Sequence, residues 1–202
     1  NGFLVKIENI KNKVPYGDRS NSIIEPLLTE QWFVNSKQLA KKPIKVVKEG
    51  KTFFYPETWT KTFFQWMKNI EPWCVSRQIW WGHRIPIWRC KWKGGAEEVF
   101  VCAFTADEAT SEASKVLSEE KQESREIFVE QENDVLDTWF SSAILPFSIF
   151  GWPKSTEDIK RYYPLSLMET GHDILFFWVA RMVMLGQGKI FSINSLSKDT
   201  KI

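Results

Sequence analysis

The first candidate for chemistry is a short polar segment around Gly171 and Asp173, set between two apolar stretches. Residues 165–169 favour a short strand, and residues 174–185 favour an almost wholly apolar helix. In open α/β sheets, ligands bind beyond the carboxyl ends of strands, where helix N-termini present free N–H groups. Gly171 would let the backbone approach such a ligand, while Asp173 would cap the helix or accept hydrogen bonds from a ribose or an amine. A plain turn and cap is the alternative, because both residue types favour turns for local reasons.

A second candidate is Trp139, whose indole stands among polar residues in the segment 133–142. A large rigid ring suits the wall of a small apolar pocket. The alternative is an ordinary core tryptophan, since buried aromatic side chains far outnumber those that contact a ligand.

The segment 73–86 mixes Arg, Gln and His with several aromatic residues. Such a mixture can hold phosphate or unpaired bases, and it can equally form a buried polar network that braces a domain joint. Neither His83 nor His172 has a partner at metal-ligand spacing, so the sequence predicts no metal site.

The elements that must position these residues follow from periodicity and turn signals. Three helices are expected, the last with Thr105 as its N-cap, over residues 36–48, 57–70 and 106–116. Strands are expected at residues 3–7, 23–28 and 99–104, a turn at 15–22, loop or strand over 74–92, and a surface loop at 118–125.

Composition narrows the possible classes of protein. The 202 residues suffice for one main unit, and 27 basic against 25 acidic side chains give no excess of charge typical of a nucleic-acid surface. Eleven Trp and fifteen Phe predict a large aromatic interior and some exposed aromatic patches. Three cysteines without a C-x-x-C pair argue against a disulfide framework and favour a reducing compartment. The longest apolar run, residues 174–185, is shorter than the roughly 20 residues that span a bilayer, so no membrane segment is expected.

At these residues the sequence resembles the class I aminoacyl-tRNA synthetases, and within them the valyl-tRNA synthetases. The resemblance extends from about Val14 to Gly186. It is carried by VPYGDRS (14–20), IIEPLLTEQWFV (23–34), WCVSRQIWWGHRIP (73–86), NDVLDTWFSSA (133–143), FGWP (150–153) and ETGHDILFFWVARMVMLG (169–186).

The resemblance implies an α/β fold, namely part of a Rossmann-like class I catalytic domain with the tail of a β-rich editing domain at the N-terminus. Residues 1–22 would end the inserted editing domain, and residues 23–186 would form the second half of the nucleotide-binding catalytic domain. A connective insertion is expected around residues 88–130, and residues 187–202 form a divergent tail.

The resemblance also implies roles for individual residues. Trp139 and Ile174 would line the valine pocket. Gly171 and Asp173 would approach the adenosine of ATP and of the valyl-adenylate, with Thr170 and His172 beside them; His172 receives no chemical role. No catalytic residue is assigned.

The expected substrates and partners are valine, ATP with Mg²⁺ and tRNA(Val), in a complete enzyme that is monomeric and cytoplasmic, with a mitochondrial parent as the alternative location. Some relatives bind zinc through cysteine pairs between these motifs, whereas Cys90 and Cys102 stand alone, so no zinc is predicted. The family's HIGH and KMSKS motifs are not found in the sequence, and the chain is expected to be an internal fragment with little activity by itself. The alternative function is a noncatalytic fragment that binds adenylate or tRNA.

Overall fold

The computed structural model describes residues 2–93, 98–117, 126–187 and 196–201. It divides into a large compact unit, Gln31–Asp199, and a small unit of Asn1–Glu30 with Thr200–Ile202. In the small unit the expected turn is confirmed: Tyr16 forms an antiparallel bridge with Ile23, and Gly17 N–H donates to the carbonyl of Ser22 (2.9 Å). The strands expected at 3–7 and 23–28 are wrong: these residues form no ladder, and the bridge of Ile23 is an isolated one that closes the turn.

Three helices follow the first strand, β1 (Thr29–Val34): α1 (Ser36–Leu39), α2 (Lys41–Lys48) and α3 (Thr58–Lys68). They confirm the helices predicted over 36–48 and 57–70. Pro43 is tolerated in the first turn of α2, where the backbone N–H groups have no partner within the helix. The aromatic face of α3 is buried through Phe63 and Met67.

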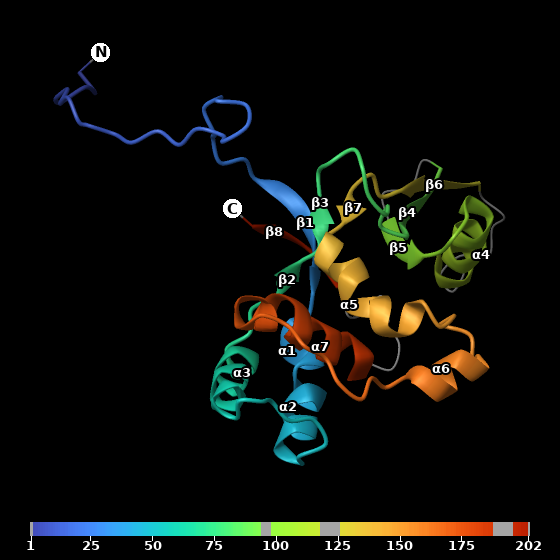
Figure 1. Ribbon diagram of the computed structural model, residues 1–202. Helices are drawn as coiled ribbons and strands as arrows, with labels where there is room; N and C mark the ends of the chain where they lie inside the picture. Colours follow the sequence, from blue (N-terminus) through green and yellow to red (C-terminus); the bar gives the residue numbers. More distant parts are fainter. Residues whose placement is uncertain (1, 94–97, 118–125, 188–195, 202) are drawn as a thin grey trace. The chain divides into compact units, whose positions relative to one another are not determined.

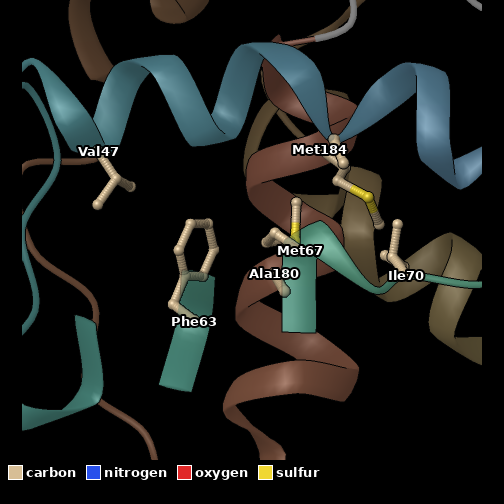
Figure 2. Close-up of a cluster of buried hydrophobic side chains, with 7 residues drawn as sticks. Val47, Phe63, Met67, Ile70, Ala180 and Met184 are labelled. Atoms are coloured by element: carbon tan, nitrogen blue, oxygen red, sulfur yellow. The ribbon is translucent and has the colours of Figure 1, made fainter. Parts of the chain in front are cut away.

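The centre of the large unit is a helical segment with three successive geometries: a 3₁₀ turn, η1 (His172–Ile174), a π-helix, η2 (Leu175–Ala180), and an α-helix, α7 (Arg181–Gln187). Its apolar surface is buried on two sides. Ala180 and Met184 pack against α2 and α3, as Figure 2 shows. On another side, Met182 and Leu185 pack against α5 (Thr138–Ser148). The prediction of an apolar, largely buried helix is therefore confirmed, although only α7 is a regular α-helix.

Within the described residues, the strands form three small sheets (Figure 1). Their orders are β2-β1-β8, β3-β7 and β5-β4-β6, and the pairings described for β1–β2, β3–β7, β4–β5 and β4–β6 are antiparallel. The bounds are β2 (Trp73–Cys74), β3 (Ser76–Arg77), β4 (Ile87–Trp92), β5 (Glu98–Cys102), β6 (Ile127–Gln131), β7 (Val135–Leu136) and β8 (Leu196–Lys201).

The sheet β5-β4-β6 is covered by the helix α4 (Ala106–Leu117), with Cys90, Ala109 and Ala113 buried between them. The expected cap is confirmed, because Glu108 N–H donates to Oγ1 of Thr105 (3.2 Å). The helix α6 (Glu157–Tyr162) is capped in the same way by Thr156. The insertion proposed around residues 88–130 and the division at residue 22 stay predictions.

The mixed helix and strand content agrees with the α/β class, but the strand expected at residues 165–169 is wrong. These residues form no ladder in the described chain, and Leu167 is exposed. Without that strand there is no strand–turn–helix unit before η1, so the Rossmann-like part of the fold stays a proposal based on resemblance. The surface loop expected at 118–125 and most of the tail at 187–202 lie outside the described residues.

Candidate functional site

A well-connected polar group beside the predicted pocket is the carboxylate of Asp137, a residue that is only 5% exposed. Asp137 is the N-cap of α5: its Oδ1 accepts a hydrogen bond from Trp139 N–H (3.3 Å). Its Oδ2 accepts one from Trp73 Nε1 (2.9 Å). A buried carboxylate must be paired and hydrogen-bonded, and here the same group also starts the helix that carries Trp139.

Two arginines complete the surroundings of Asp137. Nη2 of Arg77 lies 3.0 Å from Oδ2, and Nη1 of Arg181 lies 3.8 Å from the same atom. The second distance is an ionic contact that is too long for a hydrogen bond. Burial lowers the pKa of Arg181, and the charge of Asp137 opposes that shift. The guanidinium of Arg181 also lies over the Trp73 ring, 4.0 Å from its centroid.

Trp139 faces the π-helix. Its ring centroid is 6.4 Å from that of Phe177, with 31° between the planes, and both rings are partly exposed. Trp139 also packs on the buried cluster of Trp32, Val34 and their neighbours. Part of the Trp139 side chain therefore packs as in a core, and part is exposed. The core interpretation and the pocket-wall interpretation each apply to one part of its surface.

Phe177 was missed by reasoning from the sequence, where it reads as one apolar residue among many. The available signal was its place three residues after Ile174, on the same helical segment. Ile174 itself is half-buried at the end of η1, and no described contact joins it to Trp139. Trp178 lies beside Phe177 on the π-helix, and its indole N–H is buried without a hydrogen-bond partner in the described chain.

The predicted nucleotide-binding residues lie at the entrance to this helical segment. Gly171 precedes η1 with φ −62° and ψ 147°, and no side chain caps the turn. The prediction that Asp173 is an N-cap is wrong: Asp173 lies inside the 3₁₀ turn, because the helical geometry begins at His172. Gly171 and Asp173 are both exposed, so their polar groups remain open to a ligand.

The two neighbouring residues are placed differently. Oγ1 of Thr170 donates to the carbonyl of Gly171 (3.3 Å). The His172 ring stacks on Trp59 of α3, with centroids 5.1 Å apart and 17° between the planes. Both contacts hold the segment in place.

The segment 73–86 divides into two parts. Ser76 and Gln78 belong to a polar network: Oγ of Ser76 and Nε2 of Gln78 both donate to Oε1 of Gln31 (2.6 and 3.0 Å). Nε2 of Gln78 also donates to Oδ2 of Asp134 (2.6 Å). The bracing interpretation therefore fits this part. Farther along, Trp80 and Trp81 are 94% and 81% exposed, which confirms the expectation of exposed aromatic side chains.

The arrangement suits binding and orientation. An aromatic wall, Trp139 with Phe177, lies next to the carboxylate of Asp137 and the guanidinium of Arg181, and an exposed polar turn comes a few residues before Phe177 on the same helical segment. Across the described ranges, no cluster of three or more His, Cys, Asp or Glu side chains could hold a metal ion. None of the described helices is both long and apolar enough to span a membrane.

Comparison with known proteins gives a consistent result. The family described as tRNA synthetases class I (I, L, M and V) matches residues 5–191. The valine-tRNA ligase of Pelagibacter ubique is 50% identical over 206 residues, covering 98% of this chain and 22% of that protein. Those of Bradyrhizobium diazoefficiens and Thermotoga maritima are 50% and 49% identical over 198 and 185 residues, each covering 92% of this chain and 20% of the relative. The chain thus spans about a fifth of the length of these relatives.

Proposed function

Because the chain belongs to the class I tRNA synthetases (I, L, M and V), we propose that it supplies the valine pocket and part of the nucleotide site of a valine-tRNA ligase. The observation that carries the proposal is the partly exposed aromatic wall of Trp139 and Phe177, with the open turn of Gly171 and Asp173 a few residues before Phe177 on the same helical segment. One helical segment thus carries groups suited to an apolar side chain and, just before them, groups suited to a polar ligand.

In the proposed reaction the valine carboxylate attacks the α-phosphate of ATP, and pyrophosphate leaves. The valyl group then passes from AMP to the terminal adenosine of tRNA(Val), and Mg²⁺ accompanies the ATP phosphates. The chain's own residues contribute by positioning rather than by acid or base chemistry, since correct placement of two reactants can supply a large part of such a rate enhancement.

Trp139 and Ile174 are the proposed walls around the valine side chain, and Phe177 extends the wall of Trp139. An apolar wall separates amino acids that differ by one methylene by roughly 10- to 200-fold. The exposed carboxylate of Asp173 and the open backbone of Gly171 are the proposed contacts to adenosine. Thr170 and His172 support that turn through their contacts with Gly171 and Trp59.

A chimera tests the proposal. The segment of the Thermotoga maritima ligase that aligns with this chain is replaced by the chain's own residues, giving the Thermotoga chimera. We expect valine-dependent exchange between ATP and pyrophosphate and charging of tRNA(Val). The 202-residue chain alone is expected to show no exchange above background. A folded chimera that activates another amino acid in preference to valine, or none, would contradict the proposal; binding of a valyl-adenylate analogue without exchange would favour the noncatalytic alternative.

Valine, ATP and tRNA(Val) are thus the proposed partners. A monomeric state for the whole protein and a cytoplasmic location, implied by the resemblance, belong to the same proposal. The cysteines are compatible with a reducing compartment, because Cys74, Cys90 and Cys102 are all free thiols.

A further inference from the structure

We propose that Asp137 is a positioning residue that fixes both aromatic walls of the amino-acid pocket, Trp139 and Phe177, relative to each other. The inference rests on the proposed function, since it concerns the same pocket. It goes beyond that function by giving a specific task to a residue outside the expected ligand contacts.

The first wall is held through the start of α5. Asp137 caps that helix: its Oδ1 accepts a hydrogen bond from the backbone N–H of Trp139 at 3.3 Å. The position of the carboxylate is fixed in turn by Trp73 of β2 (2.9 Å) and Arg77 of β3 (3.0 Å). The first turn of α5 is therefore tied to two strands through one side chain.

The second wall is held through Arg181. This residue lies four positions after Phe177, and its guanidinium packs 5.7 Å from the Phe177 ring centroid and 4.0 Å from that of Trp73. The same guanidinium lies 3.8 Å from Oδ2 of Asp137. Asp137 thus attracts the side chain on which Phe177 rests, while it caps the helix that carries Trp139.

The arrangement depends on the negative charge of Asp137. One carboxylate faces two arginines, of which Arg77 is 40% and Arg181 only 14% exposed in their side chains. An amide at position 137 could still accept the hydrogen bond from Trp139 through its single oxygen, because Asn is as good an N-cap as Asp, whereas the NH₂ in place of Oδ2 could accept neither from Trp73 nor from Arg77. It would leave the guanidinium of Arg181 buried without a counter-charge, which favours movement of that side chain away from Phe177.

The test is Asp137→Asn in the Thermotoga chimera. We expect the KM for valine to rise by about tenfold or more, because a small displacement of a pocket wall has a large effect on a bound group. The kcat and the KM for ATP are expected to stay within about threefold, since the nucleotide turn is held by other contacts. Glu98→Gln is the matched control: it neutralises a carboxylate 3.9 Å from Arg89 in the β5-β4-β6 sheet and should leave all three constants unchanged.

The outcomes separate the two proposals. An unsubstituted chimera that folds but does not activate valine would contradict the proposed function. An active chimera in which Asp137→Asn leaves the valine KM within about threefold, or raises the valine and ATP constants equally, overturns the positioning role. Should the Asp137→Asn chimera fail to fold, Arg181→Lys decides by the same criteria, because it keeps the charge and removes the planar contact with Phe177.

Discussion

The carboxylate of Asp173 folds back over Gly171, so that a Cβ added to the glycine would collide with Oδ1 of the aspartate. The backbone of Gly171 has ordinary angles, φ −62° and ψ 147°, which any residue can adopt. The glycine therefore leaves room for the neighbouring carboxylate, which a Cβ would have to displace, and is not required by its own conformation. The two residues proposed for the nucleotide end of the site act as one unit.

Gly171→Ala in the Thermotoga chimera is expected to raise the KM for ATP by displacing the Asp173 carboxylate. Asp173→Asn should raise it as well, with the free energy of unfolding changed by less than about 0.5 kcal/mol because the side chain is exposed. In the double variant, the loss of apparent binding free energy for ATP should be smaller than the sum of the losses in the two single variants, since both changes act on the same carboxylate. Strictly additive free-energy effects on the KM for ATP would show that the two residues act independently.

Trp139→Ala is expected to raise the KM for valine and to weaken discrimination against larger amino acids, because the wall opposite the ligand is lost. The loss of stability should be smaller than the roughly 3–5 kcal/mol of a fully buried tryptophan, since part of the ring is exposed. Trp139→Phe should give an intermediate KM. An unchanged Michaelis constant for valine in Trp139→Ala would remove this residue from the pocket.

The cluster of Phe63, Met67, Ala180 and Met184 is expected to dominate the stability of the helical part. Phe63→Ala should lower the free energy of unfolding of the 202-residue chain by about 3–5 kcal/mol, because its ring is fully buried. Urea titration followed by circular dichroism measures the change. Phe53→Ala is the matched control, since that ring is 81% exposed, and it should alter the value by less than about 0.5 kcal/mol.

The stability of the chain should fall in alkaline solution through Cys90. Burial raises the pKa of this thiol above its ordinary value of 9.0, so the folded chain holds the proton more strongly than the unfolded chain. The contribution of the protonated thiol to the free energy of unfolding is complete below about pH 9, and it is lost as the pH rises through the folded-state pKa. Between pH 8 and pH 10, the urea midpoint should fall less steeply in Cys90→Ala than in the unsubstituted chain. Equal slopes would contradict the assignment.

Local signals predicted the local structure. The apolar spacing of α3 and the Thr105 cap of α4 depend on contacts within a few residues, and both could be read directly. The strand expected at 165–169 failed because an apolar run needs a neighbouring strand, which local sequence does not provide. The proposed role of Asp137 could not be predicted for the same reason, because its hydrogen bond with Trp73 joins residues 64 positions apart. The sequence indicated a cap at Asp173 and missed Phe177, because both depend on where the 3₁₀ and π geometries begin.

The π-helix η2 has a consequence for insertions and deletions in this segment. A π-helix contains one more residue in each hydrogen-bonded loop than an α-helix, so it can absorb the loss of one residue by becoming α-helical. A single deletion within Leu175–Ala180 would therefore leave the helix continuous and α7 in its packing. Because the total rotation about the helix axis stays nearly the same, Gly171 and Ile174 would keep their orientation relative to α7, whereas a deletion within α7 itself would rotate them by about 100°.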